Sequence, residues 1–221
     1  AFFHKLLTMH RIITIIYGVL ALSYIATTFV NTYSWSFLHK ATPILLLCII
    51  IWQRTSLPSK LLLCGALILS ATGDMLLALP IEKSFLLGLS AFAAAHILYA
   101  LFLYRWLNWQ QINVLSVVIF TAYLITMMFV LLPAVGELRV PVLAYFCVIS
   151  VMFVTAFAAN TQDYTLRIGA LFFVASDSLL AINAFITPLP LQSVLVMGTY
   201  YAAQYFIALG CLQLTKEHHV S

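Results

Sequence analysis

Long apolar runs, each about twenty residues, follow one another along almost the whole chain and are separated only by short polar segments. A membrane-spanning helix needs roughly 20 consecutive apolar residues, because the hydrocarbon core of a bilayer is about 30 Å thick. Only 7% of the residues are charged, against roughly 25% in an average soluble domain. The sequence therefore predicts an all-α integral membrane protein whose apolar surface is covered by lipid. The predicted spans are 12–30, 37–53, 60–79, 85–104, 112–132, 140–158, 166–186 and 191–214.

These eight spans and their connections fill the chain, so residues 1–221 are expected to form a single transmembrane domain. The first apolar run is too long for a signal-peptide core and lacks a clear small-x-small cleavage site, so we interpret it as a retained helix. Basic residues concentrate in the segments on the side of the N-terminus, which predicts that both termini face the cytoplasm. The compact connections favour the inner membrane of a bacterium. The basic residues on that side are Lys5, Arg11, Arg54, Lys60, Arg105, Arg167 and Lys216, against Lys40, Lys83 and Arg139 on the other.

The two halves of the chain resemble each other. Gly73-Asp74-Met-Leu-Leu-Ala in the third span matches Ser176-Asp177-Ser-Leu-Leu-Ala in the seventh. Ala94-Ala95-His96 in the fourth span likewise matches Ala202-Ala203-Gln204 in the eighth. Because four spans are an even number, both halves would enter the membrane in the same direction. We interpret the halves as parallel repeats, 12–104 and 112–214.

Asp74 and Asp177 are the acidic residues that lie well inside apolar runs. A charged side chain at the middle of a membrane costs about 2.5–3.5 kcal/mol on insertion scales, so each aspartate requires a reason. Their spans run in the same direction and place both residues at similar depth in the outer half, which predicts that they face each other across one cavity. We interpret them as a functional pair. The structural alternative is a hydrogen-bonded contact between helices.

Several polar side chains lie close to the two aspartates in the predicted arrangement. His96 is the histidine deep in a span, and Tyr99 lies three residues further on and therefore on the same face. Such groups are candidates for orienting a carboxyl group or binding a substrate, and the structural alternative is that they only satisfy one another. The remaining candidates are Tyr200, Tyr201 and Gln204 in the eighth span, Lys40 at the outer mouth of the second span, and Asn183 near the end of the seventh.

Several kinds of site are not indicated. One deep histidine and two aspartates lack metal-ligand spacing such as H-x-x-x-H, so no metal is expected. No phosphate loop, nucleotide fingerprint or G-x-S-x-G motif is present, so no cofactor is expected. The net charge of +4 comes from basic residues scattered at the ends of spans, which does not indicate a nucleic-acid partner. Cys48, Cys64, Cys147 and Cys211 lie in apolar runs and are interpreted as small buried hydrophobic residues.

The ordered set of motifs resembles the YhhN/TMEM86 family of lysoplasmalogenases. The resemblance covers most of the chain, spans two to four and six to eight, and includes the Lys40-x-x-Pro43 entry to the second span. The motifs are Ser70-Ala-Thr-Gly73-Asp74-Met-Leu-Leu77, Gly88-Leu-Ser-Ala91-Phe92-Ala-Ala-Ala-His96-Ile-Leu-Tyr99, Ser176-Asp177-Ser-Leu-Leu-Ala181 and Thr199-Tyr200-Tyr-Ala-Ala203-Gln204.

This resemblance implies a hydrolase that cleaves the vinyl ether bond of lysoplasmalogens to a fatty aldehyde and glycerophosphoethanolamine or glycerophosphocholine. It also implies that Asp74 and Asp177 are the catalytic residues. Such a reaction passes through an oxocarbenium ion, for which one carboxyl group would be the acid and the other would stabilise the cation or activate water. The expected partners are a lysophospholipid substrate and membrane lipids. The alternatives are a proton-coupled transporter that uses both aspartates as a relay, and a non-catalytic lipid-binding protein.

Overall fold

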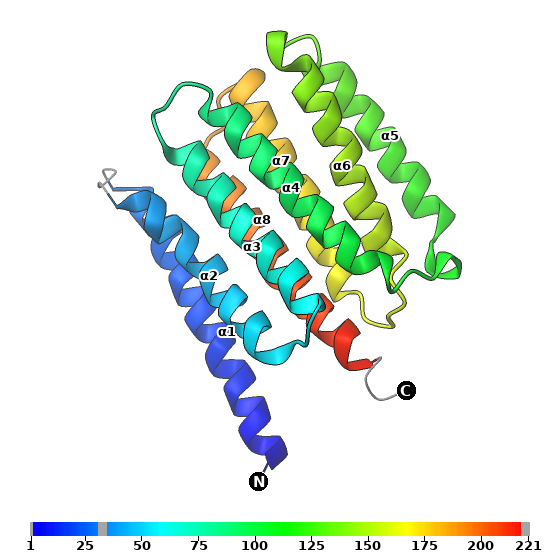
Figure 1. Cartoon of the computed structure of the whole chain (residues 1–221). Coiled ribbons are helices and arrows are strands. Elements are labelled where there is room, and N and C mark those ends of the chain that lie inside the picture. The colour runs from blue at the N-terminus through cyan, green and yellow to red at the C-terminus, as the bar shows by residue number, and fades with distance from the viewer. Residues whose placement is uncertain (1, 31–34, 218–221) are drawn as a thin grey trace.

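The computed structural model describes residues 2–30 and 35–217, with side chains at 11–30 and 35–216, and within them the chain is a bundle of eight α-helices without a strand. Figure 1 shows the helices in order along the chain. They are α1 (Phe2–Thr27), α2 (Ser36–Arg54), α3 (Ser59–Ala78), α4 (Ser84–Tyr104), α5 (Val114–Leu131), α6 (Arg139–Phe157), α7 (Thr165–Phe185) and α8 (Gln192–Glu217), with 3-10 turns at η1 (Trp109–Gln111) and η2 (Gly136–Leu138).

The observed helices confirm the all-α membrane architecture. Helices α2 to α8 begin and end within three residues of the predicted spans, and each is long and apolar enough to cross a bilayer. Helix α1 differs, because it begins at Phe2 and not at residue 12. A charged residue limits the apolar length of a span, but Lys and Arg are good helix formers and do not end the helix itself. The part of α1 whose side chains the structure describes and that was found apolar is Arg11–Thr27.

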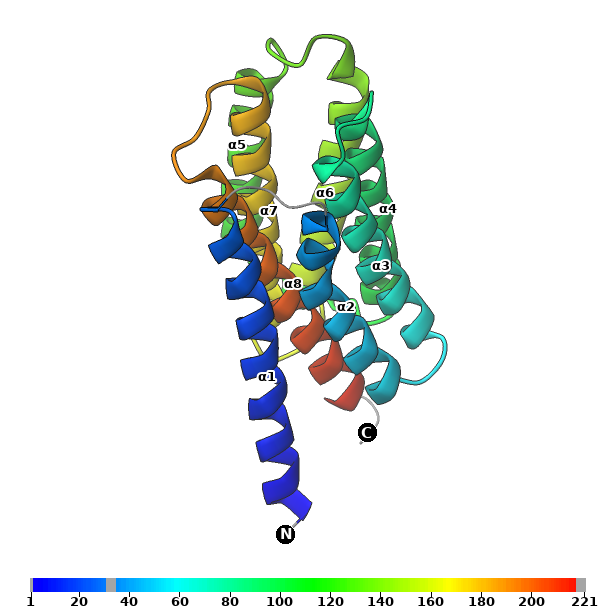
Figure 2. The same ribbon diagram turned by 90° about the vertical axis from the view of Figure 1, so that its left-hand side faces the viewer.

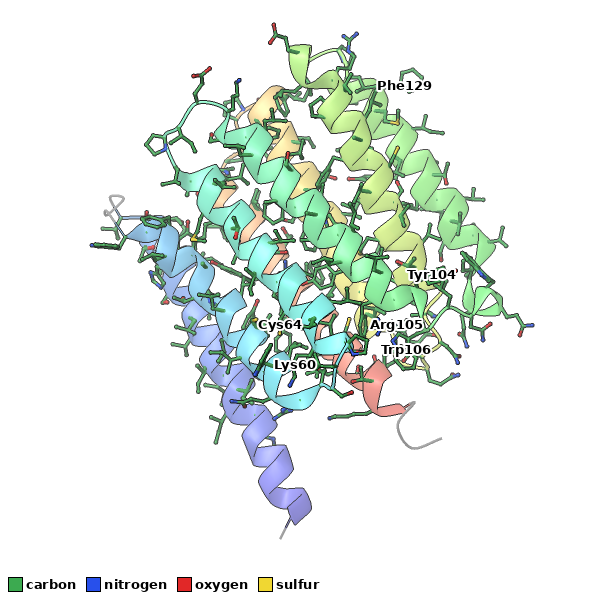
Figure 3. The ribbon with its side chains drawn as sticks, in the orientation of Figure 1. Lys60, Cys64, Tyr104, Arg105, Trp106 and Phe129 are labelled. Carbon is green, nitrogen blue, oxygen red and sulfur yellow. The ribbon has the colours of Figure 1, made fainter. Side chains whose placement is uncertain are left out.

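The bundle has two ends, which we call the terminal end and the distal end. The start of α1 and the end of α8 lie at the terminal end, as Figures 1 and 2 show. The α3–α4, α5–α6 and α7–α8 connections lie at the distal end. In Figure 3, Lys60, Arg105 and Trp106 mark the terminal end, whereas Phe129 lies near the distal end. The assignment of the terminal end to the cytoplasm stays a prediction.

Close backbone approach joins helices α3 and α4, and helices α7 and α8, into the two most extensive helix pairs. A Cβ atom on Gly88 of α4 would lie 2.7 Å from Leu77 Cγ on α3. A Cβ atom on Gly210 of α8 would likewise lie 2.7 Å from Leu166 Cβ on α7. Small residues at such crossings let helices pack where the hydrophobic effect gives no driving force. These are the pairs that the proposed repeats would equate, and the repeats themselves stay a prediction.

Helix α5 lies at one edge of the bundle, beside α6 and α7 (Figure 1). Most of its side chains face outward, and Phe129 is 79% exposed. Its buried side chains in the described structure are Phe120, Met127 and Leu131. Because exposed apolar side chains are stable in contact with lipid, α5 forms a thin wall between the interior of the bundle and the bilayer.

Candidate active site

A polar cavity of about 190 Å³ lies in the distal half of the bundle, and both Asp74 and Asp177 line it. The two carboxyl groups come from parallel helices, α3 and α7. Tyr200 of α8 and Lys40 of α2 line the same cavity. The structure therefore brings together four of the residues that the sequence indicated. The other lining residues are Tyr24, Leu77, Ala78, Phe92, Ser176, Leu180, Gln192, Ser193, Val196 and Met197.

Asp74 is 3% exposed and forms an ion pair with Lys40, with 3.0 Å between Oδ1 and Nζ. The same ammonium group donates a longer hydrogen bond, 3.4 Å, to the backbone oxygen of Asp74. The hydroxyl group of Tyr200 interacts electrostatically with the Asp74 carboxyl group. Oδ2 of Asp74 accepts no hydrogen bond from the described residues. One oxygen of this carboxylate is thus held by a cation, and the group also faces the hydroxyl of Tyr200.

Lys40, which was predicted to lie at the outer mouth of its span, is near the distal end of α2 and has a buried side chain. Helix α2 begins at Ser36, so Lys40 lies in its second turn, and its side chain is buried against α3. An ammonium group taken out of water requires a nearby negative charge, which Asp74 supplies. The charge of Lys40 therefore belongs to the cavity and not to the membrane surface.

Asp177 has different partners. Tyr145 of α6 donates a hydrogen bond of 2.6 Å to Asp177 Oδ2. Nε2 of His96, on α4, lies 3.0 Å from the Tyr145 hydroxyl oxygen and 3.6 Å from Asp177 Oδ2. A neutral His96 that carries its proton on Nε2 donates to Tyr145, which in turn donates to Asp177. Three helices therefore hold this carboxyl group through a short chain of hydrogen bonds.

Tyr145 was missed by the sequence reasoning. Its two partners lie 49 and 32 residues away along the chain, and no motif in the sixth span connects it to them. The available signal was a tyrosine in the middle of an apolar span, since a buried tyrosine hydroxyl usually finds a hydrogen-bond partner.

The other predicted site residues support the cavity from outside its lining. Tyr99 donates a hydrogen bond of 2.7 Å to Gln204 Oε1, and both side chains are buried. Tyr201 donates to the backbone oxygen of Lys40 at 2.8 Å, which joins α8 to α2. Asn183 accepts a hydrogen bond of 3.0 Å from the backbone of Leu189 and so stabilises the α7–α8 connection. Asn183 lines neither the polar cavity nor the apolar cavity described next.

A second cavity, apolar and about 60 Å³ in volume, lies among helices α4, α5, α6 and α7. It shares Asp177, Leu77, Phe92 and Leu180 with the polar cavity. Asp177 therefore lies where a polar and an apolar cavity meet. Gly73 contributes to this junction, because a Cβ atom there would lie 2.8 Å from the ring of Phe92.

The two carboxyl groups differ chemically because of their neighbours. Asp74 is paired with the ammonium group of Lys40, whereas Asp177 accepts a hydrogen bond from the hydroxyl group of Tyr145. Two carboxyl groups in unlike environments are an arrangement suited to general acid–base chemistry. Within the described residues, no group of three His, Cys, Asp or Glu side chains is placed to hold a metal ion.

In a comparison with known protein families, residues 35–211 match the model of the YhhN family. The chain is 35% identical over 184 residues to human lysoplasmalogenase TMEM86B, covering 81% of this chain and 77% of the human protein. It is 34% identical over 154 residues to a lysoplasmalogenase of Mycobacterium bovis, covering 67% and 59% of the two chains. Human lysoplasmalogenase TMEM86A is 29% identical over 173 residues, covering 73% and 70%. No solved structure matches the chain.

Proposed function

The chain belongs to the YhhN family, and we propose on this premise that it is a hydrolase of lysoplasmalogens. It would cleave the vinyl ether bond and release a fatty aldehyde and glycerophosphoethanolamine or glycerophosphocholine. The names of the relatives supply the reaction class. The observation in this chain that supports it is the presence of two carboxyl groups, with unlike partners, on one cavity buried in the bundle.

In the proposed reaction Asp177 is the acid. Two ionised carboxylates in one cavity of low dielectric constant repel each other, so one protonated and one ionised group is the favoured state. Lys40 is 3.0 Å from Asp74 and favours the ionised form there. We assign the acidic proton to Asp177, which transfers it to the β-carbon of the vinyl ether. The carbon next to the ether oxygen becomes an oxocarbenium ion, and the Asp74 carboxylate stabilises that positive charge.

Water completes the reaction. A water molecule adds to the oxocarbenium carbon and gives one proton to the ionised Asp177, which restores the acid. The resulting hemiacetal collapses when its hydroxyl proton is lost and the glycerol oxygen gains a proton. The carbon–oxygen bond to glycerol breaks, and the products are an aldehyde and an alcohol. The sum is one vinyl ether and one water, with both carboxyl groups returned to their starting states.

Tyr145 and His96 have a positioning role in this scheme. The bond from Tyr145 occupies Asp177 Oδ2, which leaves Oδ1 to carry the proton that is transferred. After the transfer, the same hydroxyl group stabilises the carboxylate that has formed, because hydrogen bonds to a charged acceptor are the stronger ones. His96 Nε2, 3.0 Å from the same hydroxyl oxygen, holds the tyrosine in place.

The test is aldehyde release from lysoplasmenylethanolamine by the full chain purified in detergent. The saturated ether analogue and the acyl lysolipid are the substrate controls. Asp74→Asn and Asp177→Asn should each lower the rate by about 10²–10⁴-fold, the range of general acid–base catalysis. Asp163→Asn is the matched control, because Asp163 lies in the α6–α7 connection, where its carboxyl group accepts a hydrogen bond from the backbone of Thr165.

The outcomes separate the reaction from its mechanism. If the folded wild-type protein releases no aldehyde specifically from the vinyl ether, the proposed hydrolase activity is contradicted. Proton-coupled transport would then be assayed. Full activity in both asparagine variants would contradict the two-carboxyl mechanism alone.

We further propose that the terminal end faces the cytoplasm, in the inner membrane if the source is bacterial. With Lys40 buried, the basic side chains at the distal end of the described structure are reduced to Lys83 and Arg139. The terminal end carries more of them, in line with the positive-inside rule. A phosphatase reporter that is active only outside the cytoplasm, fused after residue 221, should stay inactive. An active fusion would reverse the orientation. The basic residues described at the terminal end are Arg11, Arg54, Lys60, Arg105, Arg167 and Lys216.

A further inference from the structure

The apolar cavity among α4 to α7 has a lining that suits a hydrocarbon. Apart from Asp177, its polar lining side chains are Tyr123, Tyr145 and Ser178. Tyr145 is already bonded to Asp177, and Tyr123 shares a short hydrogen bond with Ser178. These hydrogen bonds occupy the polar groups within the wall. A ligand in this cavity is therefore recognised by apolar contact.

The apolar cavity lies next to Asp177, and this position indicates which part of a substrate would bind there. The apolar and polar cavities share Asp177, Leu77, Phe92 and Leu180, so the carboxyl group stands at their junction. A vinyl ether is itself a junction, because it joins a hydrocarbon chain to a polar glycerol oxygen. A molecule with its chain in one cavity and its glycerophosphate in the other would place its vinyl carbons beside Asp177.

We propose that the apolar cavity binds the alkenyl chain of the substrate and sets the preferred chain length. This inference rests on the proposed function and names the part of the site that recognises the substrate. The distal part of the cavity is lined by Ala181, Phe185, Met127 and Leu131. Ala181 lies one helical turn beyond Asp177 and therefore on the same face of α7. A larger side chain there shortens the space that a chain can occupy between Asp177 and the distal end of the cavity.

The walls of the cavity must move apart when a chain binds. Its volume of about 60 Å³ is below the roughly 300–1,000 Å³ of sites for drug-sized ligands. Helix α5 is the wall that moves, because most of its surface faces outward and its main contact with another long helix is with α7. The Tyr123–Ser178 hydrogen bond is part of that contact.

The test compares kcat/KM for substrates with alkenyl chains of different length between wild type and Ala181→Phe. We expect this variant to lower kcat/KM for a sixteen-carbon substrate relative to an eight-carbon substrate by at least roughly tenfold, since apolar pockets discriminate by about that factor. Ala184→Phe is the matched control, because Ala184 lies on the same helix with its side chain exposed. Met127→Ala enlarges the cavity from α5, and we expect it to shift the preference toward longer chains.

Binding of saturated ether lysolipids, which have no vinyl bond, separates this inference from the proposed function. In wild type the sixteen-carbon ether should bind more tightly than the eight-carbon ether, and Ala181→Phe should remove that difference. If this occurs without any aldehyde release, the chain site stands and the hydrolase fails. If hydrolysis occurs but the chain-length preference is the same in wild type, Ala181→Phe and Met127→Ala, the chain site is wrong.

Discussion

Lys40 on α2 and Asp74 on α3 form a buried ion pair, with 3.0 Å between Nζ and Oδ1 and side-chain exposures of 11% and 4%. Removal of one partner leaves the other charge buried and uncompensated, which typically costs about 3–5 kcal/mol. We therefore predict that Lys40→Met destabilises the protein by about that amount. The double variant Lys40→Met/Asp74→Asn should recover most of the loss, because neither charge then remains.

Reversible unfolding in mixed detergents gives the free energy of unfolding for each variant. Lys60→Met is the control, since Lys60 lies over the ring of Trp52 at the terminal end, 4.7 Å from its centroid, and not against a carboxylate. A double variant that is less stable than both single variants would argue against a charge pair as the cause.

The link from Tyr145 to Asp177 predicts a kinetic effect. Tyr145→Phe removes the 2.6 Å hydrogen bond to Oδ2 without removing the ring. We expect kcat to fall about 10²-fold, since a small misplacement of a reacting group has effects of that size. KM should change little, because Tyr145→Phe keeps the ring that lines the apolar cavity. Adding His96→Gln should lower kcat by little more, since both residues act through one chain of hydrogen bonds.

The measurement is the steady-state rate of aldehyde release for the single and double variants. Tyr104→Phe serves as the control, because this tyrosine is 70% exposed on the outer surface of α4. Additive effects of Tyr145→Phe and His96→Gln on kcat would mean that the two side chains act separately.

Gly73 is required for the packing of Phe92 at the junction of the two cavities. A Cβ atom at residue 73 would lie 2.8 Å from the Phe92 ring, closer than packed atoms allow. We expect Gly73→Ala to destabilise the protein by about 1–3 kcal/mol, as overpacking does, and to lower activity. Gly18→Ala should be harmless, because nothing lies within 4 Å of the added carbon. A smaller neighbour, in Gly73→Ala/Phe92→Leu, should restore part of the stability. Equal stability of Gly73→Ala and wild type would show that Phe92 moves freely.

A substitution of Asn183 tests whether this side chain has a structural role or a substrate-binding role. Its Oδ1 accepts a hydrogen bond of 3.0 Å from the backbone of Leu189. Loss of one such bond costs about 1 kcal/mol, so we predict that Asn183→Ala lowers stability by that order and leaves KM unchanged. The checks are unfolding in detergent and the KM for lysoplasmenylethanolamine. A raised KM at unchanged stability would instead support the substrate contact that the sequence suggested.

The linear sequence determined the membrane architecture and drew attention to the two aspartates. In lipid each span must satisfy its own backbone hydrogen bonds, so an apolar run of sufficient length specifies a helix wherever it occurs. For this reason the predicted ends of α2 to α8 were accurate to within three residues. An aspartate inside such a run, as at Asp74 and Asp177, is conspicuous because of its energetic cost. Both features are local properties of the chain.

The partners of those aspartates were decided by the tertiary structure. Lys40 lies 34 residues from Asp74, and Tyr145 lies 32 residues from Asp177. Which side chains meet across such distances depends on the rotation and crossing of each helix, which in lipid follow from close packing and not from hydrophobic patterning. The same packing placed the two cavities side by side at Asp177. An apolar run indicates that a helix forms, but the face that it turns toward its neighbours is settled only when the bundle packs.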